Sequence, residues 1–157
     1  MNEVERIRDQ IARSLDGEAW HGPPLMEVLS GLDADSASAR PIPNAHTSWE
    51  ILLHISAWAE VVLSRLRGEA PTLSPEQDWP APSSPGDQDA WRADLDRLRE
   101  VHRELLDELA TLDASRLDAP IVPGISSVYV TLHGLVQHNL YHAGQIALLK
   151  KAVRSDR

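Results

Sequence analysis

Residues 47–68 read TSWEILLHISAWAEVVLSRLRG, and this stretch carries signals for both ends of a helix. Thr47 and Glu50 have the spacing of a capping box, in which each side chain accepts a hydrogen bond from the other residue's backbone amide. Gly68 is the residue type that best tolerates the left-handed conformation just past a helix end. Between these ends, apolar residues recur at helical spacing. The stretch therefore predicts a helix that starts after Thr47 and stops at Gly68.

Three further segments repeat apolar residues every three or four positions, which is the spacing of one helix face. The first carries Val4, Ile7, Ile11 and Leu15; the next, capped near Asp87 or Asp89, carries Trp91, Leu95, Leu98, Leu105 and Leu109; the last runs from Ser126 or Ser127 to about Val153. The apolar stretch 25–32 predicts one or two extra turns, and the small, polar residues of 33–43 predict a loop. No strand pattern competes strongly, so the chain is predicted to be all-α with four main helices.

The connection between the second and third of these helices is long and rich in proline. Residues 69–86 hold five prolines and cannot be helical throughout. Connections between antiparallel neighbours in a bundle usually have about 2–8 residues. This one is long enough to cross the bundle, and Trp79 within it indicates packing rather than a disordered linker. We therefore expect residues 1–157 to form a single helical domain.

Composition narrows the classes of function. The 157 residues include no cysteine and seven histidines, and 15 Lys+Arg against 24 Asp+Glu give a net charge of −9. This charge disfavours nucleic acid as a partner. The start of the chain has no signal-peptide pattern, and no apolar run approaches the ~20 residues of a membrane span, so we expect a cytoplasmic protein with no membrane partner. Without cysteine, a metal site must rely on nitrogen and oxygen ligands, which directs attention to the histidines.

His138 and His142 stand four residues apart, so on a helix their side chains stack on one face. Two imidazoles placed in this way can bind one metal ion. On helical wheels both point inward, and so does His54 of the helix at 47–68. A third inward histidine would complete a three-histidine site with open positions for water or substrate. Taken singly, each feature is also explained by hydrogen-bonded or core histidines, and only the three together favour metal.

The remaining histidines and the tryptophans have ordinary structural explanations. Asn139 follows His138 at the position where zinc proteases carry their glutamate base, which excludes that motif. His102 falls on the apolar face of the third helix and is predicted to be a core residue. The alternative is that it contacts one of the metal ligands without binding the ion itself. We expect structural roles for His21, His46 and His133, core positions for Trp49, Trp58 and Trp91, and a cover over the end of the bundle from Trp20 and Trp79.

Two stretches resemble a known family. Residues 49–58 (WEILLHISAW), followed by RLRG at 65–68, and residues 134–146 (GLVQHNLYHAGQI) are similar to the second and last helices of the DinB-like (YfiT-like) superfamily of metal-dependent hydrolases. The resemblance implies a four-helix bundle with a long crossover between helices 2 and 3, and a divalent metal held by His54, His138 and His142. The family includes S-transferases that use the thiols bacillithiol or mycothiol and a mycothiol-dependent maleylpyruvate isomerase, and homodimers are common in it.

Two hypotheses of function follow. The first is a metal-dependent enzyme acting on a small molecule, either a hydrolase or a thiol-dependent S-transferase, with zinc or nickel and, in the second case, a low-molecular-weight thiol as cofactors. Glu50, Tyr141 and Gln145 lie nearest the three histidines on the helical wheels and are the candidates for a catalytic or orienting group. Capping explains Glu50 equally well, packing explains Gln145, and Tyr141 fits a place at the rim. The alternative is a non-catalytic metal-binding bundle, such as a sensor or binding module.

Overall fold

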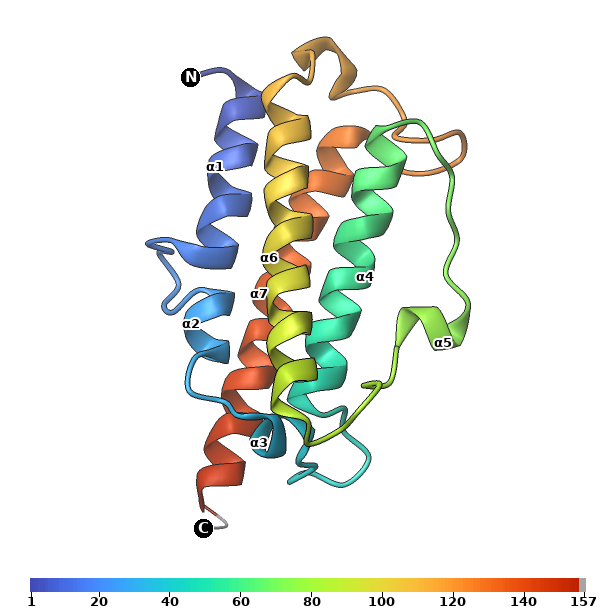
Figure 1. The fold of residues 1–157 in the computed structure, drawn as a ribbon. Coiled ribbons are helices and arrows are strands. Elements are labelled where there is room, and N and C mark those ends of the chain that lie inside the picture. The colour runs from blue at the N-terminus through green and yellow to red at the C-terminus, as the bar shows by residue number, and fades with distance from the viewer. Residues whose placement is uncertain (156–157) are drawn as a thin grey trace.

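Four long helices make up the bundle, and shorter helices lie in its connections (Figure 1). The computed structural model describes residues 1–155. The long helices are α1 (Glu3–Asp16), α4 (Ser48–Leu66), α6 (Gln88–Ala110) and α7 (Val128–Ser155). The short ones are α2 (Leu25–Leu29), α3 (Ala34–Ser38), α5 (Pro75–Asp78) and the 3₁₀ helix η1 (Ala114–Arg116). Within the described residues no strand forms, so the predicted all-α class is confirmed.

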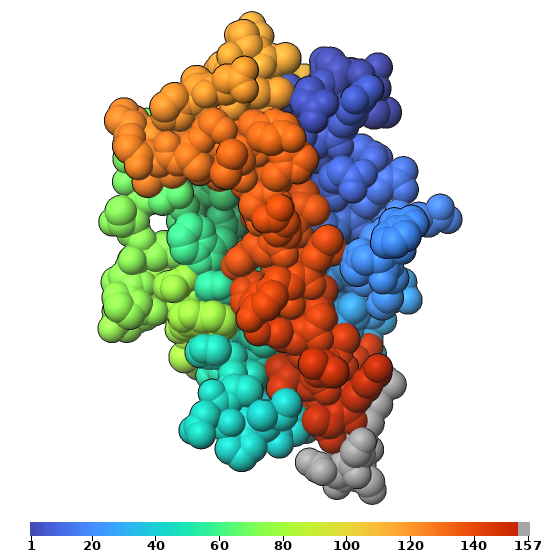
Figure 2. Space-filling model, turned by 180° about the vertical axis from the view of Figure 1, so that it is seen from behind, coloured from blue at the N-terminus to red at the C-terminus, as the bar shows by residue number. Residues whose placement is uncertain are grey.

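The four helices do not alternate in direction. Figure 1 shows α1 and α7 running one way and α4 and α6 running the other. Since α4 and α6 are parallel, the chain between them has to return along the whole bundle, and residues 67–87 do so on its outside, with α5 partway along. Both α1 and α4 pack against α6 and α7. Seen from behind, α7 runs down the middle of the molecule (Figure 2). The predicted crossover is therefore present.

The ends of α4 follow the sequence signals. The Thr47 side chain accepts a hydrogen bond from the Glu50 amide, and the Glu50 carboxylate accepts one from the Thr47 amide. At the other end, Gly68 adopts a φ of 91°, the left-handed region in which a Cβ would be strained. The start of α6 is likewise capped by Asp87, whose carboxylate accepts from the amides of Asp89 and Ala90.

Two apolar clusters fill the bundle, and a buried polar contact crosses it. One cluster joins α1, the later turns of α4 and α6, and the early turns of α7; the other joins α2, α3, the start of α4 and the later turns of α7. His102 lies in the core, where its Nδ1 donates to the Leu98 carbonyl and its Nε2 accepts from Asn139. Asn139 also donates to Ser14 of α1. Burial lowers the pKa of His102, so it is a neutral core residue, as predicted.

Three expectations of the sequence were wrong in detail. Part of the expected loop at 33–43 is the short helix α3, which Asp33 caps by accepting from the Ser36 amide. Five residues are too few to show helical periodicity, which explains why the sequence pattern did not indicate it. Trp20 is fully exposed and does not cover the end of the bundle, and Trp58 is only partly buried and lines a pocket instead of filling the core. None of the described helices combines the length and apolar character needed to cross a bilayer.

Candidate metal centre

The packing of α4 against α7 brings three histidines from distant parts of the chain together. His54 lies on α4, and His138 and His142 lie one turn apart on α7. One ring nitrogen from each histidine falls within 4.8 Å of the other two, and the Nε2 atoms of His54 and His138 are 3.0 Å apart. His54 and His142 are buried, and His138 is partly buried. The inward orientation predicted from the helical wheels therefore produces a single cluster.

Hydrogen bonds to the outer nitrogens orient two of the three rings. His54 Nδ1 donates to the backbone carbonyl of Asp78 at 2.5 Å, and His142 Nδ1 donates to Gln145 Oε1 at 2.6 Å. Because both partners are oxygen acceptors, the protons sit on Nδ1 and the Nε2 lone pairs are left free for the cluster. Histidines that bind metals in proteins are usually held in this way through the second nitrogen. The third ring, His138, has a buried Nδ1 without a hydrogen-bond partner.

The surroundings keep His138 and His142 neutral. Burial, together with the neighbouring His142 and His54, lowers the pKa of His138 from 6.5 to about 3. Burial also lowers the pKa of His142, in spite of the opposing hydrogen bond to Gln145. Neutral imidazoles are the form that binds metal ions.

The donor set fits a divalent ion. Nitrogens that each lie about 2.0–2.1 Å from a shared ion are no more than ~4 Å apart, and the separation of 3.0 Å between His54 and His138 lies within that limit. If neither of these two Nε2 atoms carried a proton, their lone pairs would face and repel each other. A cation bound between them would remove this repulsion. Imidazole nitrogen suits zinc and nickel as well as other transition metals, so a three-histidine cluster is compatible with a divalent metal.

The crossover forms one wall of the cluster. The ring of Trp79, the residue after α5, stacks on His54 with 3.8 Å between centroids and on His46 with 3.6 Å. The Asp78 carboxylate accepts a hydrogen bond from Trp58 Nε1 at 2.7 Å and lies 3.2 Å from His54 Nδ1. Asp78 and Trp79 thus attach the crossover to the site. Asp78 was missed in the sequence because an irregular connection has no periodicity that would place it; the packing of Trp79 was expected, but not its contact with a histidine of the cluster.

An open pocket adjoins the histidines. It has a volume of about 470 Å³ and a largely apolar lining that includes Trp58, Val62 and Leu135 besides the three histidines. A smaller pocket of about 300 Å³ is also lined by His142, together with Trp79 and Gln145. Tyr141 lines both pockets. The cluster is therefore buried between the helices but accessible from a cavity of the size that holds small ligands.

The three catalytic candidates have different surroundings. Glu50 accepts hydrogen bonds from Thr47 and from Arg40, and lines neither of the two pockets beside the cluster. Burial alone would raise the pKa of Glu50, but these hydrogen bonds outweigh it and the pKa lies below the ordinary value. Gln145 orients His142. Tyr141 is 67 % exposed, and its ring lies 5.1 Å from that of His142, so it stands at the rim of the site.

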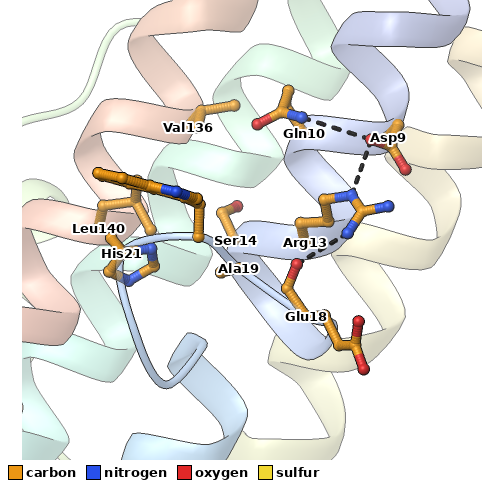
Figure 3. A pocket seen from close by; sticks show the side chains of 10 residues that line it. Asp9, Gln10, Arg13, Ser14, Glu18, Ala19, His21, Val136 and Leu140 are labelled. Atoms are coloured by element: carbon orange, nitrogen blue, oxygen red, sulfur yellow. Dashed lines mark hydrogen bonds and ion pairs between the residues drawn. The ribbon is translucent and has the colours of Figure 1, made fainter.

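A further pocket, of about 540 Å³, lies away from the cluster, between α1 and α7 (Figure 3). Val136 and Leu140 line it from α7, on a different side of that helix from His138 and His142. Arg13 and Asp9 of its lining are paired with each other at 2.8 Å, and Arg13 also donates to the Glu18 carbonyl. His21 is the one histidine in its lining. This pocket does not offer a grouping of metal ligands.

Comparison with known proteins gives one match. The family model described as the DinB superfamily matches residues 19–146, a range that contains α2 to α6 and most of α7. All three histidines of the cluster fall inside it. No curated protein and no solved structure matches the chain.

Proposed function

Because the chain belongs to the DinB superfamily, we propose that it is a metal-dependent enzyme acting on a small molecule, with His54, His138 and His142 as the ligands of a divalent ion. The observation that carries the proposal is the three-histidine cluster between α4 and α7, in which Asp78 and Gln145 hold the outer nitrogens of His54 and His142. The adjoining pocket of about 470 Å³ supports a catalytic role, because a purely structural ion needs no access from outside.

Each residue of the site has a distinct role in this proposal. Held by imidazole nitrogens, a zinc or nickel ion would lower the pKa of water or of a thiol and would polarise a substrate. His54, His138 and His142 would hold the ion, and the contacts of Asp78 and Gln145 keep the rings of His54 and His142 in place. Trp79 excludes water from one face of His54 by stacking on it. Tyr141, at the rim, would donate to a substrate oxygen.

A thiol-dependent S-transferase is the version of this function that the site favours. The sequence has no cysteine, so a sulfur nucleophile has to arrive with a low-molecular-weight thiol. Hydrolysis usually needs a base to take up a proton, and Glu50, the candidate, is already bonded to Thr47 and Arg40. A thiol ionises more readily than water and depends less on such a base. The two pockets that His142 lines would accommodate two reactants.

Metal analysis tests the first part of the proposal. We expect about one equivalent of zinc or nickel per chain after reconstitution, and a loss of binding in His54→Ala. His102→Gln is the matched control, because His102 is equally buried on the neighbouring helix but takes no part in the cluster. Retention of metal by His54→Ala at the parent's affinity would show that the ligand assignment is wrong.

Activity measurements test the second part. Metal-loaded protein should be incubated with an electrophile and bacillithiol or mycothiol, and separately with panels of esters and amides. Turnover with thiol supports the transferase, and turnover of esters or amides alone supports a hydrolase. If neither reaction is faster than with the free metal ion alone, the protein is a non-catalytic metal-binding bundle, such as a sensor.

We also propose that the protein forms a homodimer. The outer side of α7 exposes Val130, Tyr141 and Leu148, which are apolar enough to be covered by a second copy. Light scattering of the purified protein measures the mass directly, and a monomer across the micromolar range would contradict this expectation. The cytoplasmic location of the protein stays a prediction.

A further inference from the structure

Arg65 lines the pocket beside the three histidines, and within residues 1–155 its charge has no partner of opposite sign. It lies on α4, eleven residues after His54, which places it about three turns along the same face of the helix. Its Nη2 donates to the Pro71 carbonyl over 3.3 Å, which is a long bond, and its Nε is buried with no hydrogen-bond partner. No carboxylate among the described residues lies within ion-pair distance of it.

The contrast with Arg67 makes this arrangement informative. Arg67, two residues further along, pairs with Glu108 at 3.0 Å and with Glu104 at 3.6 Å. Buried donors in folded proteins are nearly always satisfied, so the unpaired Nε of Arg65 needs an explanation. In a chain with nine more acidic than basic residues, carboxylates are abundant, yet none among the described residues lies within ion-pair distance of Arg65, and Asp78 of the same pocket instead accepts from Trp58. The guanidinium is left available on the side where it lines the pocket.

The rest of the lining defines what kind of molecule would meet that guanidinium. The Arg65 Cζ lies 6.0 Å from the centre of the Trp58 ring, and Trp58, Val62 and Leu135 make up an apolar wall between Arg65 and the histidines. Guanidinium groups bind carboxylates through two parallel hydrogen bonds. Asp78, in the same pocket, disfavours a ligand with several negative charges.

We infer that the pocket binds an apolar monocarboxylic acid, with its carboxylate on Arg65 and its reacting end at the three histidines. This assignment deepens the proposed function and rests on it, because it names the class of the second reactant. The apolar wall favours the acceptor of the transfer rather than the polar thiol. About 16 Å of helix rise separate the Cα atoms of His54 and Arg65, and the Arg65 side chain reaches back along the helix, which leaves a span of roughly 10 Å.

Binding of simple probes tests the inference without any assumed reaction. The probes are 3-phenylpropanoate, 4-phenylbutanoate and 5-phenylpentanoate, each compared with its uncharged primary amide by NMR titration of the metal-free and the metal-loaded protein. We expect the best acid to bind at least about tenfold more tightly than its amide in both forms, since the charged end meets the guanidinium. In Arg65→Gln the preference should vanish, and in Arg65→Lys it should be partly retained.

The matched control is Arg67→Gln, which removes the same charge from the same end of α4 but outside the pocket; it should keep the full preference for acids. Thermal unfolding of each variant verifies that the fold is intact. Equal binding of acid and amide by the parent would overturn the inference, and so would a preference that survives in Arg65→Gln. Tighter, Arg65-dependent binding of the polar thiol acid N-acetylcysteine would also overturn it.

The same samples separate this inference from the proposed function. A preference that appears only after metal loading would place the carboxylate on the ion rather than on Arg65, and would refute the inference while supporting the metal site. Failure of the parent to bind metal would refute the proposed function. The comparison of acid with amide in the metal-free protein tests the role of Arg65 whether or not the parent binds metal.

Discussion

Acidification of the metal-free protein is expected to destabilise it, and the contribution of His138 can be worked out. In the unfolded chain His138 takes up a proton near its ordinary pKa of 6.5, whereas in the folded protein burial and the two neighbouring histidines lower its pKa to about 3. Between these two values the unfolded state binds a proton that the folded state does not. The free energy of unfolding therefore falls as the pH falls below 6.5, and the loss is complete only near pH 3.

The magnitude follows from the width of that window. At pH 5 the solution is 1.5 pH units below the ordinary value of 6.5, and at about 1.4 kcal/mol per unit the loss is at most about 2 kcal/mol. Since His138 is partly exposed, screening by solvent makes this an upper value. For a domain of this size, about 2 kcal/mol corresponds to a decrease in Tm of roughly 4–8 °C. His142 and His102, whose pKa values are also lowered by burial, act in the same direction.

Urea unfolding followed by circular dichroism, in the presence of a chelator at pH 7.5, 6.5, 5.5 and 5.0, measures the effect. His138→Gln should lose less stability than the parent between pH 7.5 and pH 5, by up to about 2 kcal/mol. His21→Gln is the control, because His21 is exposed and far from the cluster, and it should follow the parent. Parallel curves for the parent and His138→Gln would refute the reasoning, and so would a parent whose stability does not change.

Three more predictions concern the site and the fold. Gln145→Leu should weaken metal binding about 10–100-fold in a chelator competition assay, because His142 loses its orienting acceptor, and Gln145→Glu should restore it; equal affinities would contradict this. Thr47→Ala removes the cap of α4 and should lower the free energy of unfolding by about 1 kcal/mol. Leu105→Ala leaves a cavity in the core and should lower the free energy of unfolding by about 2–5 kcal/mol. Urea unfolding measures the loss in each of these two variants, and values near zero would contradict the cap of α4 or the packing of the core.

The helices were well predicted where local signals were complete. Thr47, Asp87 and Gly68 mark helix ends through hydrogen bonds and backbone conformations that involve only a few neighbouring residues. A helix as short as α3 is too short to show an apolar repeat, so it was not predicted. Local signals also do not determine how deeply a single side chain is buried. Trp58 lies on the inward side of α4 but meets a pocket, and Trp20 lies in an exposed connection. Both outcomes depend on which segments pack nearby.

The site was predictable in part. Four-residue spacing places His138 and His142 on one side of α7, and the wheel of α4 turns His54 inward. These are properties of single helices. The roles of Asp78 and Trp79 could not be derived, because they come from a proline-rich connection whose path is set by the helices it crosses. The free state of Arg65 beside the ion-paired Arg67 was equally hidden.

The sequence by itself determined the all-α class, the ends of the main helices, the long crossover and the inward sides of α4 and α7. Each of these depends on periodicity and capping, which act over a few residues. Only the tertiary structure decided that His54 lies 3.0 Å from a histidine 84 positions away, that the crossover closes one side of the cluster, and that Arg65 stands unpaired in the pocket. The physical reason is that such contacts arise when helix faces pack against one another, and an apolar face specifies that it will be buried but not which side chains it will meet.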